Sequence, residues 1–310
     1  MSDLLDRLGR AVLLTKDELV VLIRSAPHRY KVYEIAKRAR GKLRTIAQPA
    51  KEVKALQYWV MAHVLNGFDL HPAATGYRKG RSIAHNARVH ARGRFLLKLD
   101  FKDFFPSFSA RDLRVFLKKN QSDFDKETVD ALCRILFWKP KGTHELRLSI
   151  GAPSSPMLSN LLMRDFDRRV ADCCAKHEVV YTRYADDLSF SSKASEQLAA
   201  VEQSVTELCG RLKSPSLTIN EEKTVRVSKR DSRRVTGLIL TNDRKVSLGR
   251  DAKRRISATV HYFVTNRLDS EQTANLRGML NYANGVEPSF LQRLREKYGA
   301  ETIRRIQTGN

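Results

Sequence analysis

Three aspartates in two separate segments are the residues of this chain whose types and spacing could do chemistry. Asp100 ends the apolar run Phe95–Leu99, and Asp186 and Asp187 close the run Tyr184-Ala185-Asp186-Asp187. Two divalent ions held about 3.5–4 Å apart can activate an attacking hydroxyl and stabilise a leaving oxygen, as nucleotidyl transfer requires. Carboxylates from separate segments suit Mg²⁺, because this ion keeps several waters and accepts few carboxylates. The three acids therefore predict a site for two Mg²⁺ ions.

Each acidic segment also has a plainer interpretation. Asp100 could cap a turn after its strand, and the Asp186-Asp187 pair could belong to an ordinary hairpin turn. However, two adjacent like charges repel each other, so the pair needs solvent, counter-charge or metal. The occurrence of both segments in one chain favours the catalytic interpretation.

A third segment, Ile150-Gly151-Ala152-Pro153-Ser154-Ser155-Pro156, is a loop of small residues that leads into a helix. Such a loop lets the backbone approach a substrate or template closely. We expect Ser155 as the N-cap and Pro156 as the first residue of that helix. Taken alone, the segment could be a plain helix N-terminus.

The elements that must position these segments alternate between helices and hairpins. Apolar spacing and capping residues predict helices in the first 25 residues (with a capping box at Thr15–Glu18), at 51–65, from Ser109, at 196–212 and from Gly249 to the end. Alternating patterns predict hairpins from Tyr30–Ile35 with Leu43–Ile46, from Val179 to Ser192, and from Val235–Leu240 with Lys245–Leu248.

Charge is the outlying property of the composition. The 310 residues include 57 Lys and Arg against 34 Asp and Glu, a net charge of +23. This excess favours a polyanionic partner, with nucleic acid the usual one, although solubility or a membrane surface are alternatives. No apolar run is long enough for a membrane span and no secretory signal is present, so we expect a cytoplasmic protein and no membrane partner. Four cysteines without C-x-x-C spacing argue against zinc or disulfides.

These motifs together resemble a known family. Leu99–Ser107, Gly151–Pro156 and Tyr184–Asp187 are similar to motifs A, B and C of reverse transcriptases. Asn220–Thr224 resembles motif D, and Arg44–Gln57 resembles the first fingers motif. Asn86-Ala87-Arg88-Val89-His90 and Val235-Thr236-Gly237 resemble the N-A-x-x-H and V-T-G elements of the bacterial retron branch. The resemblance covers about residues 28–300.

The resemblance implies an α+β right-hand polymerase fold with fingers, an antiparallel-sheet palm and a small helical thumb. We expect an N-terminal helical segment at 1–27, fingers at 28–95, a palm at 96–235 with a helical insertion at about 110–150, and a thumb at 236–310.

The resemblance also implies roles for single residues. Asp100 and Asp186 would ligate both ions, Asp187 would complete the site, and the backbone of Phe101 would lie against the metal. The residues implied to bind the deoxynucleoside triphosphate are Arg44 (with Lys42 as a possible helper), Asp103, Phe104, Phe105, Gly151 and Lys223. Among these, Phe105 matches the steric gate that excludes a ribose 2′-hydroxyl, with a core aromatic as the alternative. Lys223 would steady the phosphates or protonate the leaving pyrophosphate, or lie on the surface.

Residues implied to contact nucleic acid lie in two regions. Asn86 and His90 flank a basic stretch, where RNA or structural contacts are expected rather than zinc. A basic track precedes and begins the thumb and is formed by Arg233, Arg234, Lys253, Arg254 and Arg255. Ile150 departs from the family pattern, because many members carry glutamine there and isoleucine cannot hydrogen-bond a nucleotide sugar.

The implied function is Mg²⁺-dependent, RNA-directed DNA synthesis on a cognate structured non-coding RNA. The resemblance further implies priming from an internal guanosine 2′-hydroxyl, branched msDNA as product, and a role in anti-phage defence with an effector protein as partner. The alternatives are a group II intron-like or diversity-generating reverse transcriptase and, from a different class, a non-catalytic RNA-binding scaffold.

Overall fold

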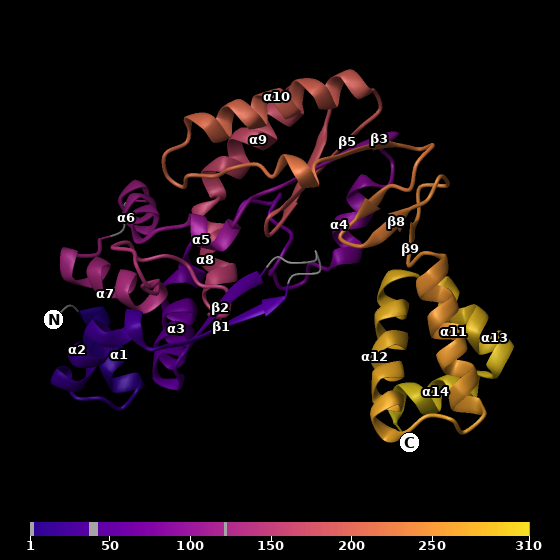
Figure 1. Cartoon of the computed structure of the whole chain (residues 1–310), viewed down its shortest axis with the longest axis horizontal. Helices are drawn as coiled ribbons and strands as arrows, with labels where there is room; N and C mark the ends of the chain where they lie inside the picture. Colours follow the sequence, from indigo (N-terminus) through magenta and orange to yellow (C-terminus); the bar gives the residue numbers. More distant parts are fainter. Residues whose placement is uncertain (1–2, 37–42, 121–122, 310) are drawn as a thin grey trace.

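A computed structural model describes residues 3–36, 43–120 and 123–309 of the chain (Figure 1). The predicted residue Lys42 lies outside these ranges. The N-terminal part contains α1 (Asp3–Ala11), α2 (Lys16–Ser25), η1 (Ala26–His28), the strands β1 (Tyr30–Ala36) and β2 (Leu43–Pro49), α3 (Lys51–His63), η2 (Leu65–Gly67) and α4 (Ile83–His90).

The centre of the molecule is a four-stranded antiparallel sheet in the order β4-β5-β3-β6. Its strands are β3 (Phe95–Asp100), β4 (Val180–Tyr184), β5 (Asp187–Ser192) and β6 (Val225–Ser228). Side chains alternate between the two faces of a strand. Leu97 and Leu99 therefore face one side of β3 and are buried in a core, while Asp100 lies on the other side.

Helices pack together with the apolar face of this sheet to form the larger core. They include α5 (Phe104–Ser107), α6 (Ala110–Lys119), α7 (Lys126–Leu136), α8 (Ser155–Leu162), α9 (Arg164–Lys176) and α10 (Ser195–Arg211), and η3 (Glu221–Lys223) precedes β6. Figure 1 shows α9 and α10 along one side of the sheet. The N-terminal helices α1 to α3 belong to the same core, which extends from Leu5 to Leu217.

A second core lies under the C-terminal helices. It is built from the small sheet β7 (Arg234–Val235), β8 (Leu238–Leu240) and β9 (Val246–Ser247) and from α11 (Arg250–Val264), α12 (Ser270–Val286), α13 (Pro288–Tyr298) and α14 (Ala300–Thr308). Figure 1 shows these four helices as a yellow group beside the rest of the chain. Ala84 and Ala87 of α4 and Leu96 of β3 complete this core.

Most predicted elements are confirmed, with two local differences. The helix after the small-residue loop is capped by Ser154 rather than Ser155, so Pro156 follows its first residue. The segment Val235–Leu240 is two strands, because Thr236 and Gly237 have φ angles of 47° and 84° and turn the chain back. The predicted capping box at Thr15 is present.

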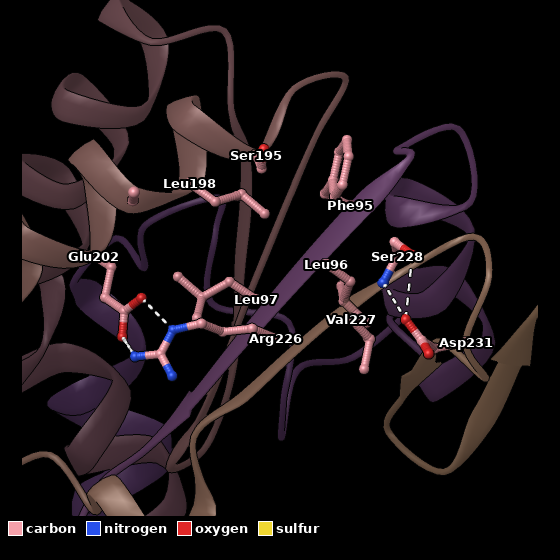
Figure 2. Close-up of a pocket in the computed structure, with 11 residues that line it drawn as sticks. Phe95, Leu96, Leu97, Ser195, Leu198, Glu202, Arg226, Val227, Ser228 and Asp231 are labelled. Carbon is pink, nitrogen blue, oxygen red and sulfur yellow. Dashed lines mark hydrogen bonds and ion pairs between the residues drawn. The ribbon is translucent and has the colours of Figure 1, made fainter.

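A cavity of about 410 Å³ lies beside β3, β6 and α10, at the Phe95 end of the strand. Figure 2 shows Arg226 of β6 reaching Glu202 of α10, with a 2.8 Å hydrogen bond from Nε to Oε2. The cavity is therefore at the opposite end of β3 from Asp100. Within the described residues, no helix is long and apolar enough to cross a membrane.

Candidate active site

The sheet brings the three predicted aspartates together. Asp100 ends β3 directly opposite Asp187, the first residue of β5, in the antiparallel register. Asp186 precedes Asp187 in the β4–β5 turn, and its carbonyl accepts a 3.3 Å hydrogen bond from the amide of Phe101. Two segments that are 86 residues apart in the numbering (186 − 100) thus meet at one sheet edge, as the sequence predicted.

Two lysines lie against these acids. Lys223 donates a 2.8 Å hydrogen bond from Nζ to Oδ1 of Asp100. Lys98 lies on the same face of β3 as Asp100, and its Nζ is 3.4 Å from Oδ1 of Asp187. Although its partial burial opposes the charged form, the bond to Asp100 and the nearby carboxylates raise the pKa of Lys223. Lys223 therefore stays protonated, and the ammonium groups of Lys223 and Lys98 lie beside the negative charge of the site.

Asp186 has a distinct electrostatic environment. Burial of its carboxyl group, followed by repulsion from Asp100 and Asp187, raises its pKa above the ordinary value, while Lys223 opposes this shift. A carboxylate in such surroundings gains from a nearby cation more than an exposed one does.

The donor set fits divalent magnesium. Asp100, Asp186 and Asp187 offer hard carboxylate oxygens from two chain segments, which is the ligand type that Mg²⁺ prefers. Among the described residues, no three His, Cys, Asp or Glu side chains already form a ligand cluster. The ammonium groups of Lys98 and Lys223 contact Asp187 and Asp100, so positive charge is already found beside these carboxylates.

A pocket of about 340 Å³ lies next to this site, between the small-residue loop and the loop before α4. Phe105 lines it, and the Phe105 ring makes an edge contact with the buried Phe104, with centroids 5.4 Å apart. Other lining residues are Lys54, Tyr58, Tyr77, Ser149, Ile150, Gly151, Ala152, Pro153, Ser155 and Pro156. The predicted nucleotide residues Phe105 and Gly151 thus share one pocket.

Backbone contacts fix the pocket's loop against the β1–β2 hairpin. Ile150 accepts a 2.9 Å hydrogen bond from the amide of Ala47 in β2. Gly151 has a φ angle of 125°, and a Cβ atom there would lie 3.0 Å from the carbonyl oxygen of Ala47. Glycine is therefore required by both conformation and space.

The other predicted nucleotide residues are not among those that line this pocket. Arg44 is exposed on β2. Burial raises the pKa of Tyr77, and the positive charge of Arg44 opposes this shift. Asp103 precedes α5 in a left-handed conformation with φ 43°. The side chain of Phe104 is buried against Phe101, so only its backbone could reach a substrate.

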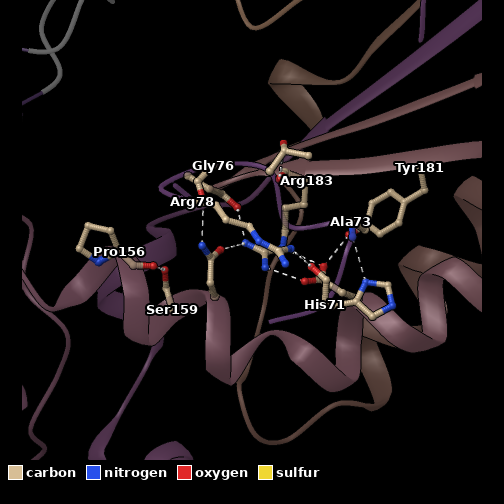
Figure 3. A network of polar contacts seen from close by, with 12 residues as sticks. His71, Ala73, Gly76, Arg78, Pro156, Ser159, Tyr181 and Arg183 are labelled. Carbon is tan, nitrogen blue, oxygen red and sulfur yellow. Dashed lines mark hydrogen bonds and ion pairs between the residues drawn. The ribbon is translucent and has the colours of Figure 1, made fainter. Parts of the chain in front are cut away.

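A buried ion pair behind the acidic turn was not anticipated from the sequence. Arg183, the residue before Tyr184, is fully buried and holds Asp167 of α9 through two hydrogen bonds of 2.8 and 2.6 Å (Figure 3). A charged residue at an inward position of β4, two residues after the core residue Tyr181, was the available signal. Such a position requires a buried partner.

Three residues that the resemblance implied in nucleic-acid contacts have buried side chains, and for Asn86 and His90 this agrees with the structural alternative. His90 is fully buried and pairs with Ser191 and Thr182 at 2.8 and 2.7 Å, and burial lowers its pKa to about 3. Asn86, one turn earlier in α4, is also buried. Arg233 is buried too and donates to carbonyl groups of Gly93, Leu240 and Thr241. His90 thus joins α4 to the central sheet, and Arg233 joins the small sheet to the segment before β3.

The other basic residues lie at the surface of the C-terminal part. Arg234, Arg254 and Arg255 are exposed. Lys253 is half-buried, and its Nζ lies 3.1 Å from Oε1 of Glu287. Lys253 therefore neutralises an internal carboxylate, and the exposed arginines carry the uncompensated charge of this surface.

Comparison with family models identifies one family. A model described as reverse transcriptase (RNA-dependent DNA polymerase) matches residues 35–240. This segment contains β2, the central sheet and all three aspartates.

Curated relatives match almost the whole chain. The retron Ec83 reverse transcriptase of Escherichia coli is 38% identical over 290 residues, covering 93% of each chain. The retron Ec86 reverse transcriptase of Escherichia coli is 31% identical and covers 99% of this chain and 94% of the relative. The retron Mx65 reverse transcriptase of Myxococcus xanthus is 31% identical and covers 94% of this chain and 70% of the relative.

Solved structures confirm the polymerase fold. Apo telomerase from Candida Tropicalis aligns with a TM-score of 0.54 at 13% identity, covering 90% of this chain and 61% of that chain. Telomerase from Candida albicans in complex with a fragment of telomeric RNA aligns with a TM-score of 0.52 at 13% identity. At this identity the likeness concerns the right-hand fold alone, which matches the α+β prediction.

Proposed function

The chain belongs to the retron reverse transcriptases and is an RNA-directed DNA polymerase, and we propose that it converts a cognate structured non-coding RNA into branched msDNA. Synthesis would begin at the 2′-hydroxyl of an internal guanosine and use deoxynucleoside triphosphates. The fold would divide into fingers at 28–95, a palm at 96–235 that contains most of the central sheet, and a thumb at 236–310 that contains α11 to α14.

The observation that carries the proposed chemistry is the meeting of the three acids. Asp100 and Asp187 are paired across β3 and β5, and Asp186 lies in the adjoining turn. We assign these three residues as ligands of two Mg²⁺ ions, with the backbone of Phe101 beside them. When bound, the ions would lower the pKa of the attacking hydroxyl and offset charge on the leaving pyrophosphate.

The remaining residues would bind and orient the substrate. Arg44 offers a guanidinium group that matches phosphate oxygens, and Phe105 limits the space beside the sugar. Lys223, which is kept protonated at Asp100, could donate a proton or a hydrogen bond to the leaving phosphates. With Ile150 in the pocket, the sugar is held by packing and by other polar groups, and the buried Ser149 and Ser155 hydroxyls have no protein partner.

The assignment of the acids is tested with the purified chain, an RNA template and a DNA primer. Asp186→Asn removes the charge of the ligand while keeping its shape, and we expect DNA synthesis to fall by about 1000-fold or more, as for loss of an essential catalytic group. Asp165→Asn is the matched control, because Asp165 is a surface residue of α9 that pairs with Lys119 and Arg168. Unchanged synthesis by Asp186→Asn would overturn the site assignment.

The msDNA proposal has a separate test in cells. The chain is expressed with its flanking DNA, and nucleic acid that co-purifies with it is treated with ribonuclease and with debranching enzyme. We expect a branched RNA–DNA species that is lost in Asp186→Asn. If linear DNA forms from an added template but no branched species exists in cells, the polymerase chemistry stands and the msDNA proposal fails.

We also propose an effector protein as partner in anti-phage defence, since the retron relatives support this branch over group II intron-like or diversity-generating enzymes. The test compares plaque formation on cells carrying the full locus with cells carrying the Asp186→Asn variant. Equal plaque numbers on both would contradict a defence role that depends on DNA synthesis.

A further inference from the structure

The acidic turn is held from behind by the guanidinium group of Arg183. Two of its nitrogen atoms bind Asp167, and the third, Nη1, donates to the carbonyl of Ala185 at 3.2 Å and to Oδ1 of Asn160 at 3.0 Å (Figure 3). Ala185 has a left-handed φ of 56°, a strained conformation for a residue with a side chain. The bond to its carbonyl therefore helps to hold the turn that presents Asp186.

Asn160 links this guanidinium group to a second segment. It lies on α8, is fully buried, and its Nδ2 donates a 2.9 Å hydrogen bond to the carbonyl of Gly76. The side-chain oxygen of Asn160 thus accepts a hydrogen bond from Arg183, behind the acidic turn, and its side-chain nitrogen donates one to the loop before α4.

That loop touches both the turn and the substrate pocket. A Cβ atom on Gly76 would lie 3.0 Å from the amide nitrogen of Ala185, so the loop backbone packs directly on the turn. The next residue, Tyr77, lines the pocket that contains Phe105, and its ring centroid is 6.0 Å from that of Tyr184. A movement of Gly76 therefore changes the pocket and the turn together.

We propose that Asn160 is a positioning residue that couples the pocket loop at Gly76–Tyr77 to the acidic turn at Ala185–Asp186. The proposal rests on the assignment of Asp186 to the active site made above. Through Arg183, the amide oxygen of Asn160 holds the carboxyl group of Asp186 in register with Asp100. Through Gly76, the amide nitrogen sets the position of the Tyr77 ring in the pocket.

Two substitutions separate these effects. Asn160→Ala removes the hydrogen bonds to Arg183 and to Gly76. The resulting displacement of the Asp186 carboxylate should lower kcat by about 10- to 100-fold and raise the half-saturating Mg²⁺ concentration. Asn160→Asp keeps an acceptor for Arg183 but cannot donate to Gly76. This variant should raise the KM for deoxynucleotides while keeping the Mg²⁺ dependence near that of the unsubstituted chain.

Ser159→Ala is the matched control. Ser159 is equally buried on the same helix but donates only to the carbonyl of Pro156, at 2.9 Å. The purified variants are compared for kcat and KM on an RNA template, for Mg²⁺ dependence, and for melting temperature. A purely structural role would lower the melting temperature without a specific change in Mg²⁺ dependence.

The outcomes are distinct. The proposal is overturned if Asn160→Ala matches Ser159→Ala within about twofold in kcat and Mg²⁺ dependence, since a positioning role predicts a larger loss. If Asn160→Ala does not fold, the Asp variant decides, because an unchanged KM for deoxynucleotides contradicts the link to Gly76. Full activity of Asp186→Asn would instead refute the underlying site assignment.

Discussion

The Phe105 ring illustrates how one side chain could decide which sugar the pocket accepts. It lines the 340 Å³ pocket and is held by its edge contact with Phe104, which is itself buried. A rigid aromatic wall excludes an additional hydroxyl group by its volume, without a hydrogen bond.

Phe105→Ala should therefore admit ribonucleotides. We expect the preference for deoxynucleotides over ribonucleotides to fall by about 10- to 200-fold, the range for changes in the fit of a small group to an apolar pocket. The measurement is the ratio of kcat/KM for the two substrates, with Phe68→Ala as a control, because Phe68 packs on Phe116 away from the pocket. An unchanged ratio would identify Phe105 as a core aromatic only.

The sequence predicted single residues best where motif and position agree. Asp100, Asp186 and Asp187 could be predicted because strand ends and a hairpin tip place side chains at a sheet edge. The ion pair of Arg183 with Asp167 could not be predicted from the sequence, because the two residues lie on different elements and no local sequence pattern links them. The burial of Asn86 and His90 could not be predicted, because a motif does not reveal whether its polar groups face solvent or a core.

At the scale of elements, the loop at Gly151 joins the β1–β2 hairpin to the start of α8. Gly151→Ala would place a methyl group 3.0 Å from the Ala47 carbonyl oxygen, in a conformation that side chains rarely adopt. We expect a loss of stability of about 1–3 kcal/mol and a higher KM for deoxynucleotides. Thermal melting and steady-state kinetics measure the two effects.

The control for this change is Gly210→Ala near the end of α10. A Cβ atom there meets no atom within 4 Å, and alanine favours the helix by about 0.5–1 kcal/mol. Gly210→Ala should therefore be neutral or stabilising. If Gly151→Ala and Gly210→Ala have the same melting temperature and the same KM for deoxynucleotides, the close contact between Gly151 and the β1–β2 hairpin is not important for stability or substrate binding.

Helix α4 is tied to β4 and β5 by a neutral imidazole. Burial lowers the pKa of His90 to about 3 from its ordinary value of 6.5, because the charged ring loses its hydration. Below pH 6.5 the unfolded chain binds a proton that the folded chain does not. Stability should thus be fully present above pH 6.5 and fall by about 1.4 kcal/mol per pH unit as the pH drops toward 3.

Urea unfolding between pH 4 and 7 measures this dependence. His90→Gln should be less stable at pH 7 but show a pH slope smaller by about one proton. His144→Gln, at an exposed position, should keep the original slope. If His90→Gln keeps it as well, the imidazole is not the group that titrates.

The extent to which elements could be predicted depended on their length and their surroundings. Long amphipathic helices and the hairpins at Tyr30 and Val179 were placed within a few residues. In the small sheet, the pairing of β8 with β9 was predicted, but β7 was not, because Thr236 and Gly237 interrupt a run that is apolar enough for one strand.

At the scale of the whole molecule, the net charge of +23 governs association with RNA. Neutralising phosphates releases counterions, so affinity falls with salt on a logarithmic scale. Arg254→Gln with Arg255→Gln should weaken RNA binding and reduce the salt slope by about 0.7 for each phosphate that the variant no longer neutralises. Filter binding at several salt concentrations measures this, with Arg304→Gln as a control at a residue paired with Glu301.

Strand β3 contributes side chains to both hydrophobic cores. Leu97 and Leu99 enter the larger core, whereas Leu96, on the face that ends in Asp100, enters the core of the C-terminal helices. The C-terminal part therefore cannot be exchanged between relatives as an independent module without also replacing the residues of β3 and α4 that it covers. Chimaeras should retain activity only when these residues of β3 and α4 are exchanged together with the C-terminal part.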